Sequence, residues 1–304
     1  MSTEPYDHRK PLIPYAIGWT FHAQQHIAPP PPELGRRGCM NTPGQYSHLK
    51  KLHPIEQCLE NQPLEGYYGS THIDLCVRDT IRVEDEHNAQ LAVVEVLAAE
   101  PPVDGLVQGA HVVAKLYDPL YMDDEDLSMN AFMMADQSYT CEVAAYNILP
   151  DLQGTMIPRY YGSYSLDIPV ELPGGIPGKR SVRLILIECI SGSCMRDLDP
   201  GAMPQSARQN IMKSIIGFET LVFHRHALLR DLHPRNIILA ETGGIVFVDF
   251  GDTWFPSTNK FTANKFRYLG NRWASPILRW HEARTGAFRK HEFHEWIDWN
   301  WQPC

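Results

Sequence analysis

The sequence lacks the marks of a secreted, membrane-spanning or nucleic-acid-binding protein. Its seven cysteines include no C-x-x-C pair, and an odd, scattered set is typical of reduced thiols rather than of a disulfide framework or a zinc site. The first residues contain no apolar stretch of a signal peptide, and no apolar run approaches the ~18 residues of a membrane span. The net charge of −9 argues against nucleic acid as a partner. We therefore expect a cytoplasmic, or alternatively nuclear, protein without membrane or nucleic-acid partners.

The composition is that of a globular chain with a substantial core. Hydrophobic residues make up 43% of the chain and charged residues 21%, which are ordinary values for folded domains. A length of 304 residues suits one two-lobed domain or two modest ones. We find no internal repeat.

Residues 1–65 differ in amino-acid composition from the rest of the chain. They are rich in Pro, His and Gln, and the run Pro29–Pro32 forms a stiff break. We expect an N-terminal extension with little regular structure. His22 and His26 have i, i+4 spacing but lack the Glu of an H-E-x-x-H motif, so a solvated segment is favoured over a metal site.

Periodicity predicts strands and a helix in the next part of the chain. Alternating polar and apolar residues favour a strand over 71–81, and 90–98 and 111–117 are two further candidate strands. The acidic run 123–126 is typical of a solvated loop. Apolar residues at helical spacing follow over 138–149, where Ser138 is a candidate cap.

Further elements follow the same rules. Two strands are expected over 158–164 and 182–190, joined by a loop at 170–180 with several Pro and Gly residues. An amphipathic helix is expected over 205–228. Two short strands complete the set, at 237–240 and 244–248. The remaining C-terminal part is expected to be helical and irregular, with its aromatic tail packed against the second lobe.

Two acidic motifs flank the hairpin of these last strands. The first is Leu229–Asn236, which reads L-R-D-L-H-P-R-N, and the second is Val248–Gly251, which reads V-D-F-G. Together they resemble the protein-kinase superfamily, whose catalytic loop H-R-D-L-x-x-x-N is followed by D-F-G. The motif R-D-L-H-P-R-N is similar to that of uncharacterised kinase-like proteins of filamentous fungi.

The resemblance implies an α+β, bilobal, protein-kinase-like fold. The first lobe would be a small antiparallel sheet plus one helix over 66–190. The second would be a reduced, mainly helical lobe over 191–304 with the aromatic tail. ATP, with Mg²⁺, would lie between the two lobes.

The resemblance also implies roles for the two motifs. Asp249 would bind Mg²⁺, and Asn236 would supply a neutral oxygen to a second metal ion. Asp231 would accept or orient the proton of an attacking hydroxyl. His233 replaces the lysine of the catalytic loop, and in its protonated form it would reach the γ-phosphate.

Other positions follow by the same resemblance. Lys115 would touch the α- and β-phosphates, and Glu142 on the next helix would hold it in place. The segment Glu188–Ile190 would be a hinge that hydrogen-bonds adenine, with Ile187 as the gatekeeper beside it. Gly192–Ser193 would open the turn into the second lobe.

Simpler interpretations remain open for these residues. Asp231, Asn236 and Asp249 could be turn residues that cap a hairpin. Lys115 could be an exposed strand lysine, and Glu142 a surface helix carboxylate.

The sequence departs from the kinase pattern at several places. Leu229 stands where the family has histidine, a packing position where leucine is tolerable. The segment Arg82–Asn88 contains no glycine, although the family places a Gly-rich loop there whose N–H groups cover the phosphates. Little chain follows Gly251, and it contains no A-P-E motif.

Two main functions are compatible with this pattern. The first is an ATP-dependent phosphotransferase that acts on a hydroxyl of a small molecule or an unusual protein substrate. The alternative is a pseudokinase, a nucleotide-binding or scaffold module without phosphotransfer. Transfer of another part of ATP, such as AMP, is a third option.

A basic segment lies near the C-terminus. Residues 258–290 hold eight Lys or Arg and one acid, Glu282. A solvated face is the favoured interpretation. The functional alternative is a dock for an anionic substrate or an acidic partner.

Overall fold

The computed structural model describes most of the chain and confirms an α+β fold with a large antiparallel sheet. The described residues are 10–32, 51–122, 130–172, 175–256, 275, 277 and 292–299. The acidic run 123–126 lies outside them, as does nearly all of the basic segment 258–290.

The chain divides into two units. The first comprises residues 1–143 and 160–189, and the second comprises 144–159 and 190–304. Helix α3, Ala131–Ile148, contributes its residues up to Val143 to the first unit and the rest to the second. This helix begins seven residues earlier than the predicted start at Ser138.

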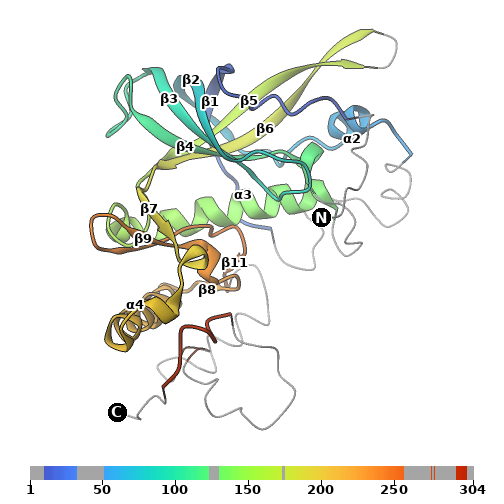
Figure 1. The fold of residues 1–304 in the computed structure, drawn as a ribbon. Helices are drawn as coiled ribbons and strands as arrows, with labels where there is room; N and C mark the ends of the chain where they lie inside the picture. The colour runs from blue at the N-terminus through green and yellow to red at the C-terminus, as the bar shows by residue number, and fades with distance from the viewer. Residues whose placement is uncertain are drawn as a thin grey trace. The chain divides into compact units, whose positions relative to one another are not determined.

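The first unit is built on a closed barrel of antiparallel strands in the order β1-β2-β3-β4-β6-β5 (Figure 1). The strands are β1 (Thr20–Ile27), β2 (Tyr67–Arg82), β3 (Gln90–Glu100), β4 (His111–Tyr117), β5 (Tyr160–Leu172) and β6 (Ile176–Glu188). In β3 every second side chain is buried over the first seven residues, because successive side chains of a strand point to opposite faces. The predicted strands at 71–81, 90–98 and 111–117 are confirmed.

Three predictions about this unit are wrong. The sheet is not small, because β1 closes it into a barrel by pairing with both β2 and β5. Residues 1–65 are not without regular structure, since they contain β1 and helix α2 (Pro54–Glu60). The loop predicted at 170–180 is mostly strand, because β5 extends to Leu172 and β6 begins at Ile176.

Strand β1 also corrects the interpretation of the two N-terminal histidines. His22 is exposed on the outer face of the strand, whereas His26 is fully buried. The Nδ1 atom of His26 lies 2.6 Å from the hydroxyl of Tyr139. Burial, with a smaller effect of Arg183, lowers the pKa of His26 to about 4, so this ring is neutral near pH 7.

The second unit has one long helix and several short strands. Helix α4 (Gln205–His224) begins where predicted and buries Met212, Ile215 and Phe218. The strands are β7 (Gly192–Cys194), β9 (Ile237–Ala240) and β10 (Ile245–Phe247) in one sheet, and β8 (Leu228–Leu229) with β11 (Thr253–Trp254) in another. The described part is thus not mainly helical, contrary to the prediction. The predicted packing of the tail is confirmed at Phe293 and Trp296, which are both buried.

Gly192 lies in strand β7 rather than in the turn that was expected. A Cβ atom at this position would lie 2.3 Å from the carbonyl oxygen of Leu239 and 2.9 Å from the Cα of Ala240. Both obstacles are backbone atoms of the paired strand β9, so they cannot rotate away. Glycine is therefore required for the close approach of β7 to β9.

We expect Gly192→Ala to lower the free energy of unfolding by about 1–3 kcal/mol, because the added methyl group forces the two strands apart. Gly244→Ala is the matched control, since a Cβ there meets no atom within 4 Å. Urea denaturation of both variants checks the prediction. Equal stability of Gly192→Ala and the wild-type chain would show that β7 is not held against β9 as described.

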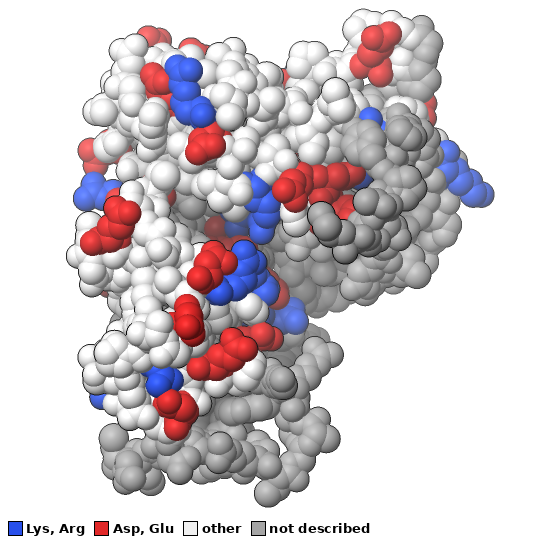
Figure 2. All heavy atoms as spheres, in the orientation of Figure 1, with Lys and Arg blue, Asp and Glu red and all other residues white. Residues whose placement is uncertain are grey.

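The exposed charges of the described residues lie in small mixed groups. On the face drawn in Figure 2, acidic and basic side chains are interspersed among uncharged ones. Exposed ion pairs among the described residues include Arg225–Asp151 at 2.8 Å and Lys179–Asp167 at 2.5 Å. Among the helices of the described part, none is long and apolar enough to cross a membrane.

Candidate functional site

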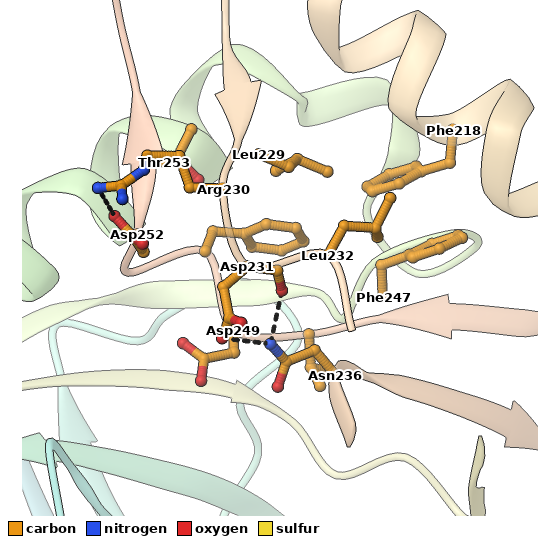
Figure 3. Close-up of a pocket in the computed structure, with 12 residues that line it drawn as sticks. Phe218, Leu229, Arg230, Asp231, Leu232, Asn236, Phe247, Asp249, Asp252 and Thr253 are labelled. Carbon is orange, nitrogen blue, oxygen red and sulfur yellow. Dashed lines mark hydrogen bonds and ion pairs between the residues drawn. The ribbon is translucent and has the colours of Figure 1, made fainter. Parts of the chain in front are cut away.

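Both acidic motifs meet in a pocket of the second unit (Figure 3). Asp231, Asn236 and Asp249 lie together at one end of the pocket, and Phe218 and Phe247 stack at the other. The rest of the lining is Leu229, Arg230, Leu232, Val248, Phe250, Asp252 and Thr253. Three of the residues predicted to carry chemistry therefore share one site.

Asp231 and Asn236 are held by a network within their own loop. The amide nitrogen of Asn236 donates to the backbone oxygen of Asp231 at 2.9 Å and to its carboxylate at 3.0 Å. Asn236 is buried, whereas the side chain of Asp231 is about one-third exposed at 34%. Because its nitrogen faces Asp231, the amide oxygen of Asn236 points the other way (Figure 3). That oxygen is suited to a hard cation.

Asp249 is placed by the backbone of the same hairpin. The N–H of Val248, directly before it, donates to the backbone oxygen of Asn236 at 2.9 Å. Phe250, directly after it, is buried, with its ring centroid 5.4 Å from that of Tyr146. Asp249 itself has φ of 66°, a left-handed conformation that is uncommon for residues other than glycine. Such strain is found where a site fixes the direction of a side chain.

His233 has a structural role in the loop. Its Nδ1 atom accepts the N–H of Arg235 at 3.1 Å, which caps the turn Pro234–Asn236. Its Nε2 atom lies 3.0 Å from a carboxylate oxygen of Glu292 in the C-terminal tail. Partial burial, together with the charge of Arg235, holds the pKa of His233 below its usual range. The ring is therefore neutral near pH 7 and does not replace the positive charge of a lysine.

Arg235 was not among the predicted site residues. Its guanidinium lies 2.5 Å from the second carboxylate oxygen of Asp231. Asp231 is thus held on one oxygen by Arg235 and on the other by Asn236. In the sequence, Asp231 and Arg235 are an acid–base pair at i, i+4. This spacing predicts an ion pair only on a helix, and these residues lie in a loop.

A second pair in the pocket joins residues that are distant in sequence. Arg230 lies 3.3 Å from Asp252 and stacks over the ring of Trp254, with the guanidinium carbon 4.1 Å from the ring centroid. Burial, and to a lesser extent the charges of Asp231 and Asp249, hold the pKa of Asp252 above its usual range, and Arg230 opposes this. Asp252 thus lines the same pocket as Asp231 and Asp249.

The donors at this end of the pocket are oxygen atoms of the kind that Mg²⁺ prefers. Within the described residues, no group of three or more His, Cys, Asp or Glu side chains is arranged to hold a metal ion. Mg²⁺ is commonly bound by one or two carboxylates, with phosphates and water filling its remaining positions. The carboxylate of Asp249 and the amide oxygen of Asn236 supply donors of that type.

Lys115 and Glu142 form the predicted ion pair, within the first unit. The amine of Lys115, on β4, lies 2.5 Å from a carboxylate oxygen of Glu142, on α3. The hydroxyl of Tyr117 donates to the same oxygen at 2.7 Å. Both charged side chains are buried, with exposed fractions of 6% and 0%. The interpretations of Lys115 as an exposed strand lysine and of Glu142 as a surface carboxylate are therefore excluded.

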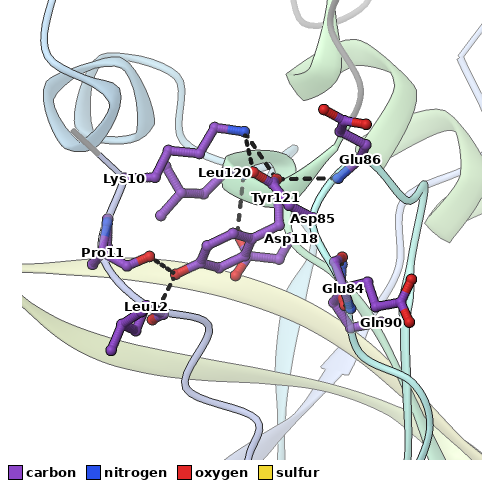
Figure 4. Close-up of polar contacts among 10 residues, drawn as sticks. All are labelled: Lys10, Pro11, Leu12, Glu84, Asp85, Glu86, Gln90, Asp118, Leu120 and Tyr121. Carbon is purple, nitrogen blue, oxygen red and sulfur yellow. Dashed lines mark hydrogen bonds and ion pairs between the residues drawn. The ribbon is translucent and has the colours of Figure 1, made fainter. Parts of the chain in front are cut away.

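The loop between β2 and β3 stands where the resemblance places a Gly-rich loop, and three of its N–H groups donate within the protein (Figure 4). The N–H of Glu84 donates to the side chain of Gln90 at 2.8 Å, and that side chain donates back to the oxygen of Glu84 at 2.8 Å. The N–H of Glu86 donates to Asp85 at 3.1 Å, and that of His87 to the oxygen of Tyr121 at 3.2 Å. These groups are not directed at a phosphate.

The N-terminal segment fastens the same loop. The amine of Lys10 lies 2.9 Å from Asp85. The hydroxyl of Tyr121 donates to the backbone oxygens of Pro11 and Leu12, each at 3.1 Å (Figure 4). The loop is thus fixed from two sides. Within it, Glu86 has a left-handed φ of 67°, a backbone conformation that favours glycine.

The residues predicted to hold the base occupy the end of β6 and the segment after it. Ile187 is buried and pairs with Val113 of β4, and Glu188 is the last residue of the strand. Cys189 is exposed and Ile190 is half-buried. The first unit ends at Cys189 and the second continues from Ile190.

Comparison with known proteins adds no family to these observations. No protein-family model matches the chain, and no curated protein matches it either.

Proposed function

We propose that the chain is an atypical kinase-like protein that binds Mg-ATP and transfers the γ-phosphate to a hydroxyl of a small molecule or an unusual protein substrate. The observation that carries this proposal is the joint placement of Asp231, Asn236 and Asp249 in one pocket. A carboxylate, an amide oxygen and a second carboxylate are the groups that phosphoryl transfer requires for metal binding and for orienting a hydroxyl.

The roles follow from the contacts of each side chain. Asp249 and the amide oxygen of Asn236 would hold the metal, which neutralises charge on the phosphates when bound. Asp231 would accept the proton of the acceptor hydroxyl. Arg235 and Asn236 would keep its carboxylate in one orientation, since each holds one of its oxygens.

The fold proposal is the bilobal protein-kinase-like arrangement, with Lys115 as a phosphate ligand oriented by Glu142. The buried Lys115–Glu142 pair supports this part, because kinases hold the corresponding lysine by a glutamate of the following helix. Ile187, Glu188 and Ile190 remain proposed contacts of the base.

A pseudokinase is the second candidate, and the loop between β2 and β3 favours it. The loop carries Glu84, Asp85 and Glu86 and has its N–H groups engaged elsewhere. Negative side chains repel phosphates, so a grip on the triphosphate from this loop would be weak. Such a protein would bind nucleotide without transferring phosphate.

We expect Mg-ATP to stabilise the protein against thermal unfolding, by about 2.7 kcal/mol at 100 times its Kd. The shift should require Mg²⁺ and disappear in Asp249→Asn. The matched control is Asp167→Asn, which changes an exposed carboxylate of β5 bound to Lys179. Absence of any Mg-ATP shift in the wild-type protein would refute nucleotide binding.

A transfer assay then separates the candidates. Release of γ-phosphate, with the product identified by mass spectrometry, supports the kinase proposal. A product carrying AMP indicates transfer of another part of ATP. Binding without any transfer across a broad hydroxyl panel supports the pseudokinase.

A further inference from the structure

A cluster of metal-ligating side chains lies on the outer face of the barrel, apart from the pocket described above. His22 is on β1, and His72 and Asp74 are on β2. The Nε2 atom of His22 lies 3.1 Å from the Nδ1 atom of His72, and its Nδ1 atom lies 2.8 Å from a carboxylate oxygen of Asp74. We propose that His22 and His72 together bind a divalent transition-metal ion, with Asp74 orienting His22.

The strand register makes this cluster a fixed feature of the sheet. His22 stands opposite Asp74, and Gln24 stands opposite His72. Side chains two residues apart share a face of a strand. The side chains of His22, His72 and Asp74 therefore project from the same side of the sheet. Each of these residues is exposed, so an ion can reach them and keep water in its remaining positions.

The hydrogen bond to Asp74 prepares His22 as a ligand. A carboxylate accepts only, so Nδ1 of His22 carries the proton and Nε2 has the lone pair. Metal-binding histidines generally donate their second ring N–H to a carboxylate or carbonyl in this way, which fixes the ring and its tautomer.

The separation of the two nitrogens suits a shared ion. Metal–nitrogen bonds of about 2.0–2.1 Å place two ligand nitrogens roughly 2.9–3.4 Å apart for bond angles between square and tetrahedral. The observed 3.1 Å lies in this interval. The rings now share a hydrogen bond and lie at 18° to each other. For His72 to bind the ion through Nδ1, its proton moves to Nε2 of the same ring, and the exposed His72 ring turns so that its Nδ1 lone pair faces the ion beside Nε2 of His22.

Two imidazoles select Zn²⁺, Co²⁺, Ni²⁺ or Cu²⁺ over Mg²⁺ and Ca²⁺. The described residues hold no group of three or more His, Cys, Asp or Glu side chains arranged for a metal ion, so water would fill the remaining positions of an ion bound by this pair.

Binding would cross-link β1 to β2. Strand β1 comes from the N-terminal part of the chain and closes the barrel, so an ion at this position would restrain it. The site does not depend on the proposed nucleotide chemistry, because all its residues belong to the outer face of the first unit.

Titration of the full chain with Zn²⁺ in an isothermal calorimeter, under reducing conditions, tests the proposal. We expect His22→Ala and His72→Ala each to weaken binding at one site more than about tenfold, and Asp74→Asn to weaken it about tenfold. The matched control is His224→Ala, which removes an exposed histidine of the second unit and should leave the site unchanged.

A second measurement needs no variant. Paramagnetic Co²⁺ added to the wild-type chain should shift the imidazole NMR signals of His22 and His72 at a lower concentration than those of other exposed histidines. Hydrogen exchange of β1 amides should slow when Zn²⁺ is bound. Unchanged Zn²⁺ affinity in the double variant His22→Ala/His72→Ala, or no Zn²⁺ binding by the wild-type chain, would overturn the proposal.

Discussion

Asp231→Asn is expected to lower the rate of γ-phosphate transfer by about 10²–10⁴-fold while leaving Mg-ATP affinity nearly intact. The substitution keeps the shape of the side chain but removes its ability to accept a proton, and general base catalysis is worth this range of rates. The binding donors Asn236 and Asp249 are untouched. The measurement is single-turnover transfer from γ-labelled ATP, with Mg-ATP affinity determined on the same preparations.

A neighbouring carboxylate supplies the control for this experiment. Asp252 lines the same pocket and is paired with Arg230, so Asp252→Asn changes the local charge by the same amount. We expect that variant to retain most of its turnover. Equal losses in both variants would mean that Asp231 acts only through its charge, and equal turnover of Asp231→Asn and wild type would remove it from the mechanism.

The largest expected effect on stability is at the pair between β4 and α3. Lys115→Met removes the ammonium group that lies against the buried carboxylate of Glu142. The hydroxyl of Tyr117 still donates to that carboxylate. Removing one partner of a buried ion pair costs about 3–5 kcal/mol. Native-state hydrogen exchange of the β4 and α3 amides measures this loss within the first unit.

Two further variants test whether the loss of stability comes from the burial of the Lys115–Glu142 pair. Glu142→Gln combined with Lys115→Met makes the site neutral and should recover much of the lost stability, because no isolated charge remains. Lys179→Met breaks a pair of the same length, 2.5 Å, whose lysine side chain is 72% exposed, and should leave the stability nearly unchanged because exposed ion pairs contribute little. A cost for Lys115→Met as small as that for Lys179→Met would contradict the buried pair.

The local elements could be predicted because their signals are local. The segment Thr71–Leu75 of β2 alternates buried and exposed residues, and β3 and β4 are rich in valine, which favours strands. Strand β1 was missed because the alternation in Thr20–Ile27 is carried by polar and weakly apolar residues such as His22 and Ala23, within a Pro-rich part of the chain. Its place in the barrel depends on pairing with β2 and β5, and pairing over such separations leaves no trace in a single sequence.

The candidate site was predictable in its residue types but not in its contacts. The spacing of Asp231, Asn236 and Asp249 was enough to place them at one hairpin. The roles of Arg235 and His233 depend on how the loop turns, which puts one on Asp231 and ties the other to Glu292. The lysine–glutamate pair was predicted from resemblance, yet its complete burial is a property of tertiary packing alone.

The loop between β2 and β3 contains no glycine, and the structure shows what holds it. Gln90 bonds it from within, and Lys10 and Tyr121 bond it from outside. Glu86 has a left-handed φ of 67°, which favours glycine, so these contacts hold the loop in place although it contains none. The engaged N–H groups and the acidic side chains favour weak phosphate binding and therefore the pseudokinase.

The most direct test of the account is the position of a metal ion in crystals grown with Mn²⁺ and a non-hydrolysable ATP analogue. Mn²⁺ replaces Mg²⁺ at oxygen ligands and is located by its anomalous scattering. We predict a peak bonded to the carboxylate of Asp249 and the amide oxygen of Asn236, at about 2.1 Å from each, and lost in Asp249→Asn. Bound nucleotide with no metal at these two side chains, or no nucleotide at all, would contradict the proposal.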